Sequence, residues 1–313
     1  MITNKEKNFV SAVVYVHNNE NYIGSFIKDI ATILSDNFEK YEIICVNDHS
    51  DDNSVKEIKN ASDKVKGSLS FINMSFYQGI EAAMNAGIDL AIGDFVFEFD
   101  SSLMDYSIDT IMKVYYRSLE GFDIVSAAPK VIKKHTSKLF YSIFNKYAKT
   151  EYKIRTESFR ILSRRAINRV HAMSDTIPYR KVFYANCGLK SDTIIYNNDN
   201  FGKDKQTVEI RDNRKNMAIN SMMLFTDFAY NFAIILAGIM MLVTIGTAIY
   251  TLIVFLGSTK PVEGWTTTML FLSFAFFGVF AISAIIIKYL TIIVNLIFKK
   301  QKYSIESVEK LSK

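Results

Sequence analysis

Several features that mark common protein classes are scarce or missing in this sequence. Its 313 residues include only 3 prolines and 2 cysteines, and 49% of them are hydrophobic. Such a composition excludes a disordered chain. We expect Cys45 and Cys187 to be packing residues in a reducing compartment. No glycine-rich phosphate loop of the GxGxxG or GxxxxGK(S/T) type follows the first strand-like run, which excludes a Rossmann dinucleotide fingerprint.

Charge is almost missing from the region 228–298. The stretch 228–256 contains no charged residue. The stretch 266–287 contains none either, and Lys288 directly follows it. A bilayer core needs roughly 20 apolar residues in a helix. We therefore predict two transmembrane helices, about 228–256 and 266–287, the second continuing to about 298. The connection 257–265 is short and turn-like, so the two helices should form a hairpin.

Basic residues around this hairpin predict its orientation. Arg211, Arg214 and Lys215 precede it, lysines of the 299–313 tail follow it, and the connection carries only Lys260. The positive-inside rule therefore places both ends of the hairpin in the cytoplasm. The polar start of the sequence does not resemble a signal peptide. We expect a multi-pass protein of the cytoplasmic membrane, with its N-terminal domain and both termini in the cytosol.

The segments beside the hairpin also suggest contact with the bilayer. The segment 206–227 joins basic residues to the apolar run MMLF, which predicts an amphipathic helix lying on the membrane. An ordinary amphipathic helix packed on the domain is the alternative. The tail 299–313 is too charged for a core and is expected to be cytosolic. Small residues in the hairpin, such as Gly238 and Gly246, suit packing against a second copy of the chain, so a homo-oligomer is one option, and the sequence leaves the oligomeric state open.

Residues 1–205 alternate strand-like and helix-like runs. The strand-like runs are 9–16, 41–46, 69–74, 94–99 and 124–127, and the helix-like runs are 23–34, 55–61, 79–92 and 107–119. This alternation predicts an α/β fold, with a Rossmann-like, mostly parallel sheet covered by helices on both faces. Ligands of such sheets bind beyond the carboxyl ends of the strands.

Polar side chains gather at three of these strand ends. The set consists of His17, Asn19 and Glu20 after the first strand, Asn47 and Asp48 after the second, and Asp100 and Ser102 after the fourth. Carboxylates, amides and hydroxyls that converge on one sheet edge predict a nucleotide site. The alternative for each residue taken alone is to cap the helix that follows it.

Six short segments form a series along the chain. VVYVHNNE at 13–20 and VNDHSDDNS at 46–54 cover the first two strand ends, and GIEAAMNAGIDLAIGDFVFEFD at 79–100 covers a helix, a Gly-Asp pair and the fourth strand. SFRILSRRAIN follows at 158–168, and EGWTTT at 263–268 and QKYSIESV at 301–308 flank the second apolar stretch. Together they resemble the family-2 glycosyltransferases of the GT-A fold. The closest resemblance is to the polyprenyl-phosphate branch, which includes dolichyl-phosphate mannose synthases and undecaprenyl-phosphate sugar transferases.

The resemblance implies an inverting transfer of a hexose from a UDP- or GDP-sugar to polyprenyl (undecaprenyl) phosphate, for cell-envelope glycans. A phosphate monoester is already anionic near pH 7, because its second pKa is about 6. No strong general base is then needed. The leaving diphosphate needs a divalent cation or positive side chains. The expected partners are the donor, the lipid acceptor and the bilayer, and no nucleic acid is expected.

The resemblance also assigns roles to residues by position. Asp100 and Arg160 would be catalytic, and Arg160 stands between apolar neighbours, where an arginine needs a partner. The nucleotide-sugar group is Tyr15, His17, Asn19, Glu20, Asn47, Asp48 and Gly79. The acceptor-phosphate group is Lys130, Lys133, Lys134, Arg160 and Arg164. The alternative for these lysines is a solvated basic face that attracts lipid headgroups.

The metal motif departs from the family pattern. Its second aspartate is replaced by Ser102 and its amide by Met104. Mg²⁺ binds through one or two carboxylates together with substrate phosphates. We therefore expect Mg²⁺ or Mn²⁺ to bind Asp100 with Ser102, and Asp105 is a further candidate ligand.

Two other functions are open at this point. The altered metal motif also fits a catalytically weakened relative that serves as a membrane-bound partner or regulator of another glycosyltransferase. A transferase acting on a glycan hydroxyl would need a positioned base near the acceptor. The region 125–192 has no clear acidic motif for one, since Glu157 and Asp175 look like helix-terminus residues.

Overall fold

The computed structural model describes residues 5–131, 135–147, 152–173, 179–197, 264–298 and 303–312, with a few single positions between 232 and 246. The chain divides into two compact units. One unit holds the N-terminal domain together with the C-terminal strand, and the other holds the long helix α10 (Gly264–Phe298).

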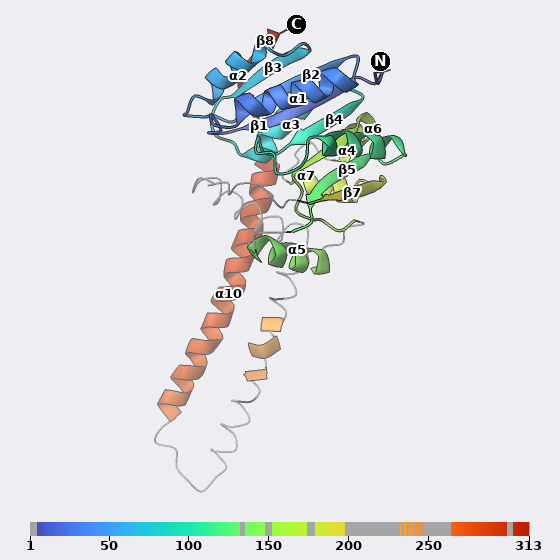
Figure 1. Ribbon diagram of the computed structural model, residues 1–313. Helices are drawn as coiled ribbons and strands as arrows, with labels where there is room; N and C mark the ends of the chain where they lie inside the picture. Colours follow the sequence, from blue (N-terminus) through green and yellow to red (C-terminus); the bar gives the residue numbers. More distant parts are fainter. Residues whose placement is uncertain are drawn as a thin grey trace. The chain divides into compact units, whose positions relative to one another are not determined.

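The first unit is built on a sheet that has eight strands among the described residues (Figure 1). The order is β7-β5-β6-β4-β1-β2-β3-β8. The strands are β1 (Val10–Val16), β2 (Tyr41–Asn47), β3 (Ser68–Met74), β4 (Phe95–Phe99), β5 (Ile124–Pro129), β6 (Phe159–Ser163), β7 (Ser191–Tyr196) and β8 (Ile305–Ser312). β1 pairs in parallel with β2 and β4, β2 with β3, and β5 with β7. Only β6 and β8 run antiparallel to their neighbours among these strands. The predicted mostly parallel α/β sheet is thus confirmed.

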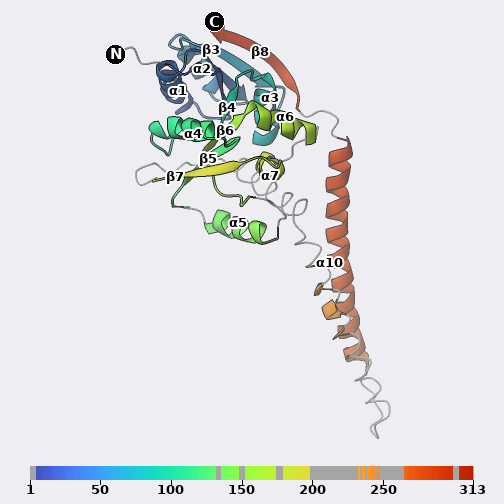
Figure 2. The same cartoon turned by 90° about the vertical axis from the view of Figure 1, so that its right-hand side faces the viewer.

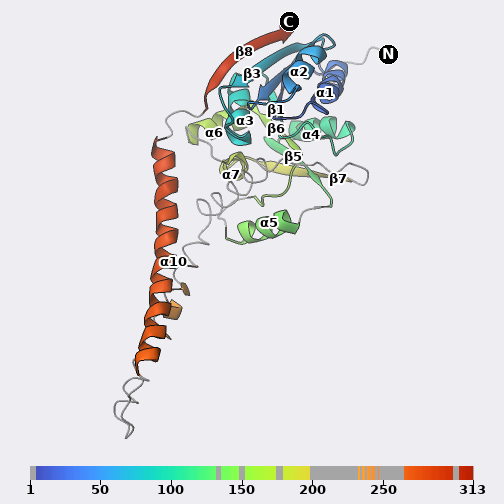
Figure 3. The same cartoon turned by 90° about the vertical axis from the view of Figure 1, so that its left-hand side faces the viewer.

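Helices cover both faces of this sheet. The helices of the unit are α1 (Ile23–Asn37), α2 (Ser54–Ser62), α3 (Ile80–Leu90), α4 (Asp109–Leu119), α5 (His135–Tyr147), α6 (Arg164–Met173) and α7 (Arg180–Asn186). Buried residues of α1, α2 and α4 form one core cluster with one face of the strands. Those of α3, α6 and α7 form a second cluster with the other face. Figures 2 and 3 show α1 and α4 on one side of the strands and α3 and α6 on the other.

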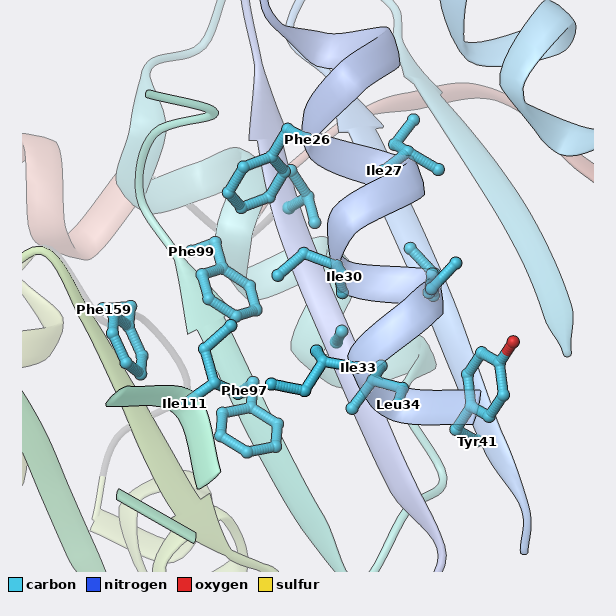
Figure 4. Packing of buried hydrophobic residues seen from close by; sticks show 14 of the residues in the cluster. Phe26, Ile27, Ile30, Ile33, Leu34, Tyr41, Phe97, Phe99, Ile111 and Phe159 are labelled. Atoms are coloured by element: carbon cyan, nitrogen blue, oxygen red, sulfur yellow. The ribbon is translucent and has the colours of Figure 1, made fainter. Parts of the chain in front are cut away.

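The packing of α1 shows how sequence spacing builds the first core. Its apolar residues recur three or four positions apart and so share one face of the helix. Phe26 reaches from α1 toward β4, where its ring meets that of Phe99 at 5.3 Å between centroids (Figure 4). Burial of each such side chain away from water contributes roughly 1.5–3 kcal/mol to the stability of the folded protein.

On the opposite face, α3 approaches β1 and β2 closely at Gly87. A Cβ atom at this position would lie 2.3 Å from Val13 Cγ1 and 2.8 Å from Val46 Cγ2. Contacts between carbon atoms are optimal at about 3.5–4.0 Å. A side chain at residue 87 would therefore push α3, and the turn before it, away from the strand ends.

The C-terminal tail is part of the sheet. β8 pairs antiparallel with β3 and forms an edge of the sheet, which Figures 2 and 3 both show. The sequence predicted only a charged tail outside the core. Charged residues such as Glu306, Glu309 and Lys310 are common on edge strands, because they discourage pairing with other chains.

The second unit is described mainly by α10. This helix has 35 residues, and Lys288 is the only charged residue in its sequence. Of the residues that the structure describes in full, no helical stretch is long and apolar enough to cross a membrane. The predicted amphipathic segment 206–227 lies outside the described residues, and so does most of the predicted helix 228–256.

Candidate functional site

The strand order reverses beside β1. The chain adds β2 and β3 on one side of β1 and then returns to place β4 on the other side. Such a switch point is where α/β sheets bind ligands, beyond the carboxyl ends of the strands. The residue Asp48 follows β2, and Asp100 follows β4. They flank the carboxyl end of β1, which carries Tyr15.

The loops after β1 and β2 are held together by hydrogen bonds. The backbone N–H of Asn19 donates to Ser54 Oγ at 2.8 Å, and that of Glu20 donates to Asp52 Oδ2 at 2.9 Å. Glu20 Oε2 accepts from the backbone and side-chain nitrogens of Asn53, at 3.0 and 2.9 Å. Glu20 and the Asn19 backbone therefore help to fix the two loops to each other.

Both loops contain a residue in the left-handed backbone region. Asn18 has φ 52° and His49 has φ 55°. Non-glycine residues in this region cost energy and are held there by their surroundings. His17 Nδ1 lies 2.7 Å from the backbone oxygen of Asp48, and its ring meets that of Tyr77 at 4.5 Å between centroids. The loops are thus rigidly specified.

The carboxylate of Asp48 is fully buried and accepts three hydrogen bonds. The backbone N–H of Gln78 donates to Oδ1 at 2.8 Å, while that of Gly79 (2.8 Å) and the hydroxyl of Tyr15 (3.1 Å) donate to Oδ2. Gly79 has φ 86°, a conformation that glycine adopts without strain. Burial raises the pKa of Asp48, and the hydrogen bonds from Gln78, Tyr15 and Gly79 offset this only in part.

Asn47 joins the same network from the neighbouring position. Its Nδ2 donates to Asn73 Oδ1 at 2.6 Å, and its Oδ1 accepts from Ser50 Oγ at 2.5 Å. The structure therefore brings the predicted nucleotide-sugar group together at one edge of the sheet. Contact of these residues with a nucleotide stays a prediction.

Asp100 is held by two arginines. Its Oδ2 lies 3.2 Å from Arg160 Nη2, and its Oδ1 lies 2.8 Å from Arg180 Nη2. Arg160 is 2% exposed and Arg180 is 1% exposed, whereas the Asp100 side chain is 20% exposed. Asp100 is thus the exposed end of a buried ionic cluster.

Further carboxylates complete this cluster. Arg160 pairs with Glu98 at 2.7 Å and with Glu157 at 2.9 Å. Arg180 pairs with Glu81 at 2.8 Å, and with Glu98 at 3.0 Å in an ion pair without hydrogen-bond geometry. Glu98 faces Arg160 in the register of β4 and β6. The predicted need of Arg160 for a partner is confirmed. Glu157 is not at a helix terminus, because it precedes β6.

The charges of this cluster shift its pKa values. Burial alone would raise the pKa of Asp100, but attraction by Arg180 and Arg160 outweighs burial and holds that pKa well below its usual value. Burial alone would lower the pKa of Arg160, and the carboxylates raise it. Burial and the nearby Glu98, which accepts from Tyr184 OH at 2.5 Å, raise the pKa of Tyr184. Asp100 is therefore a carboxylate and both arginines are cations at neutral pH.

The described side chains do not fit a divalent cation as they are placed. Both oxygens of Asp100 already lie against guanidinium groups. Asp105 Oδ1 accepts from Ser158 Oγ at 2.9 Å and from Tyr196 OH at 2.7 Å. Ser102 Oγ is buried and has no hydrogen-bond partner. No group of three or more His, Cys, Asp or Glu residues suited to a metal occurs in the part of the chain that the structure describes.

The predicted acceptor-phosphate group is not assembled as a whole. Lys130 is exposed after β5, while Lys133 and Lys134 lie outside the described residues. The placement of Arg164 contradicts its predicted membership of this group, because Arg164 lies at the opposite end of the sheet from Asp100. It follows Ser163, which pairs with Phe95 at the start of β4, and it donates to the backbone oxygens of Ala91 and Gly93. Its role is to hold the 91–93 turn.

A cavity of about 280 Å³ lies next to Arg160. β5, β7, α7 and the 152–157 segment all contribute to its lining. Its cationic lining residues are Lys153, Arg155, Arg160 and Lys181, and its anionic ones are Glu157 and Asp192. Sequence reasoning missed Lys181, Arg180 and Glu98. Glu98 alone carried a signal, since a carboxylate between two phenylalanines of a strand needs a buried partner.

Comparisons with known proteins agree with this architecture. The model of the family described as Glycosyl transferase family 2 matches residues 11–183. An uncharacterized glycosyltransferase from Synechocystis is 26% identical over 196 residues, or 61% of this chain and 61% of that protein. A prophage bactoprenol glucosyl transferase homolog from Escherichia coli is 30% identical over 196 residues, or 60% of this chain and 62% of that protein. The chain thus spans about three fifths of the length of these relatives.

A solved structure resembles the chain more distantly. Glucosyl-3-phosphoglycerate synthase from Mycobacterium tuberculosis has a TM-score of 0.49 and 14% sequence identity, over 69% of this chain and 78% of that chain.

Proposed function

Because the chain belongs to glycosyl transferase family 2, we propose that it is a membrane-bound, inverting hexosyltransferase. In this proposal it moves a sugar from a UDP- or GDP-sugar to polyprenyl phosphate. The observation that carries the proposal is Arg160, which contacts Asp100 at the switch point and also lines a cavity rich in cations. One residue thus joins the place expected for the donor to a place suited to an anionic acceptor.

The donor side of the proposal rests on the network around Asp48. Hydrogen bonds cross-link the two loops, and the same network includes Tyr15 of β1, His17 and Asn47 of β2, so it forms a fixed edge beside the strand ends. A rigid edge lowers the entropic cost of holding a base and ribose. Asp48 itself is buried, so it acts by shaping the turn at Gly79.

The acceptor side rests on the cavity. Lys153, Arg155 and Lys181 can approach a phosphate monoester as charged donors beside Arg160. An acceptor that is already anionic needs orientation and charge neutralisation, not a general base. Relatives described as bactoprenol glucosyl transferases, such as that of Shigella phage SfV at 29% identity over 196 residues, support a polyprenyl phosphate acceptor.

The chain's own residues would act mainly by positioning and electrostatics. Arg160 and Arg180 carry positive charge next to Asp100, where the leaving diphosphate would lie. A bound Mg²⁺ or Mn²⁺ would add positive charge at the same place. Such an ion stays part of the proposal only if it displaces a guanidinium from Asp100. Ser102 Oγ, which is buried and has no hydrogen-bond partner, would be a second ligand from the motif. No step of the transfer is assigned to it.

The sequence supports the membrane part of the proposal. The runs 228–256 and 266–287 are each free of charge, and basic residues flank the pair on both sides. In this arrangement the protein lies in the cytoplasmic membrane with its glycosyltransferase domain in the cytosol, where a lipid-linked phosphate can reach the cavity. The homo-oligomer also stays a proposal.

One observation favours a second function. Asp100 is neutralised by two guanidinium groups, and the second carboxylate of the metal motif is Ser102. A domain that keeps the family fold but holds its key carboxylate in this way could serve as a non-catalytic partner of another glycosyltransferase. A glycan hydroxyl acceptor has no such support, since the nearby Glu157 is paired with Arg160.

Turnover by the purified full-length chain distinguishes these functions. The assay supplies undecaprenyl phosphate with a panel of UDP- and GDP-sugars, in Mg²⁺, Mn²⁺ or EDTA, and measures sugar in the extracted lipid. Transfer to the lipid with one donor is the expected result, and Arg160→Lys should reduce it while Arg165→Gln, outside the cluster, should not. Nucleotide binding without transfer to any acceptor would favour the non-catalytic partner instead.

A further inference from the structure

The beginning of the C-terminal strand touches the turn that holds Asp48. The backbone N–H of Ser304 donates to Gln78 Oε1 at 2.8 Å, and Gln78 Nε2 donates to the backbone oxygen of Ser304 at 2.7 Å. The backbone N–H of the same Gln78 donates to Asp48 Oδ1 at 2.8 Å. One residue therefore bonds the C-terminal segment through its side chain and the buried carboxylate through its backbone.

A second path runs in parallel through β3. Glu306 Oε2 accepts from Asn73 Nδ2 at 2.9 Å, and Asn73 Oδ1 accepts from Asn47 Nδ2 at 2.6 Å. Asn47 in turn accepts from Ser50 in the loop after β2. The two series of hydrogen bonds begin at Ser304 and Glu306, which are two residues apart in the sequence. They end at the adjacent residues Asp48 and Asn47.

The rest of β8 is attached by contacts that do not reach the site. Ser312 Oγ donates to the backbone oxygen of Gly67 at 2.8 Å, and Leu69 N donates to Ser312 Oγ at 2.9 Å. Glu309 pairs with Lys59 of α2 at 3.0 Å, with both side chains nearly half exposed. β8 thus has one end joined to the strand-end network and one end that only completes the sheet.

We propose that the segment 304–306 is a positioning element of the donor site, acting through Gln78 and Asn73 on Asp48 and Asn47. This inference rests on the proposed nucleotide-sugar site. Gln78 and Asn73 are positioning residues in this account, because they set the turn at Gly79 and the end of β2 without serving as ligands themselves. The donor site is then complete only when the segment after α10 has joined the sheet.

Nucleotide binding by full-length variants in detergent tests this inference. The probes are UDP and GDP, titrated by isothermal calorimetry into wild type, Gln78→Met, Asn73→Ala and Ser312→Ala. Methionine keeps the length of Gln78 but removes both hydrogen bonds to Ser304. We expect Gln78→Met and Asn73→Ala each to weaken nucleotide binding about 3- to 10-fold, the factor that corresponds to one lost hydrogen bond of ordinary strength. Ser312→Ala should leave the affinity unchanged.

Thermal midpoints separate positioning from simple loss of stability. Ser312→Ala removes a β8 contact just as Gln78→Met does, so both should lower the midpoint by similar amounts, while only Gln78→Met lowers affinity. Gln78→Glu, which keeps the bond from the Ser304 N–H, replaces Gln78→Met if that variant fails to fold, and it should also weaken binding. Unchanged affinity in the Gln78 and Asn73 variants would overturn the inference. Wild type that binds neither UDP nor GDP would overturn the proposed donor site itself.

Discussion

Two aspartates lie at the ends of the strands on either side of β1, and their surroundings differ. Asp48 accepts from two backbone N–H groups and a tyrosine hydroxyl, all of them neutral. Asp100 lies against the guanidinium groups of Arg160 and Arg180. Burial raises the pKa of Asp48, and the neutral donors do not reverse that shift. At Asp100 burial acts in the same direction, but the two cations reverse the shift.

The difference shows two ways of fixing a buried carboxylate. At the end of β2, Asp48 is held mainly by hydrogen bonds from backbone N–H groups. The backbone conformation of the turn, including the positive φ of Gly79, therefore matters most. At β4 the geometry depends on charge, because the carboxylates of Glu81, Glu98, Glu157 and Asp100 surround the two arginines. Removing Arg160 leaves Glu157 without its ion pair and leaves Glu98 and Asp100 with one guanidinium each instead of two, in a largely buried place. The β4 site should therefore be far more sensitive to charge than the β2 site.

The largest effect is expected from Arg160→Ala. This change leaves Glu98, Glu157 and Asp100 without one of their cations in a buried place. Breaking such a buried pair costs about 3–5 kcal/mol. We expect a large fall in the midpoint of thermal or urea unfolding of the full-length protein in detergent, measured at pH 7.

Arg165→Ala provides the matched control. Arg165 also pairs with a carboxylate, Asp123, but its side chain is 70% exposed. Asp123 is only 6% exposed, but it also accepts from Ser163 Oγ at 2.7 Å and so keeps a hydrogen bond when Arg165 is lost. An ion pair whose cation is exposed contributes little, so the midpoint of Arg165→Ala should fall much less than that of Arg160→Ala. An equal fall of the midpoint in the two variants would show that the ion pairs of Arg160 contribute no more to stability than the ion pair of Arg165.

The sequence predicts the order of the central elements well, because their apolar patterns are strong. The run 23–34 corresponds to α1, and 41–46 to β2, within a few residues at each end. β6 and β8 were missed for a physical reason. The strand residues FRILS include a buried arginine, and IESVEKLS is an edge strand whose charges face solvent, so neither has the pattern of a buried strand.

The candidate site was predictable where it follows strand ends, and at Arg160, which stands between apolar neighbours in the sequence. Asp48, Asn47 and Asp100 are found by that rule, since parallel strands bring their carboxyl ends to one edge. Arg180 comes from α7, eighty residues beyond Asp100, and nothing near it in sequence indicates that it reaches this carboxylate. Gln78 is similar, because its partner Ser304 is 226 residues away. Such long-range pairs are fixed by the fold, not by local pattern.

A second, smaller effect tests the metal at Asp100. Arg180→Gln removes one positive charge next to Asp100 Oδ1 and keeps a side chain that can donate a hydrogen bond. One unit charge at 4 Å in water is worth about 1 kcal/mol, roughly a fivefold change in affinity. We expect Mn²⁺ to bind at least fivefold more tightly to Arg180→Gln than to wild type, as measured by the electron paramagnetic resonance signal of free Mn²⁺. Arg165→Gln is the control, and an unchanged Mn²⁺ affinity in Arg180→Gln would remove Asp100 from the candidate metal ligands.

The smallest effect is a difference in acid response between the two aspartates. The folded pKa of Asp100 lies below the ordinary value of 3.8 for an aspartate, so its stabilising effect is present above about pH 4 and is lost as pH falls further. The folded pKa of Asp48 lies above 3.8, so protonation favours the folded state and stability falls as pH rises through that pKa.

We expect the thermal midpoint of Asp100→Asn to fall less than that of wild type between pH 4 and about pH 3. That of Asp48→Asn should fall more than wild type as pH drops from 7 to 4, because the variant lacks the stabilising protonation. Parallel midpoint curves for the two variants would mean that charged and neutral partners hold these carboxylates equally, and the contrast between the two strand ends would then be wrong.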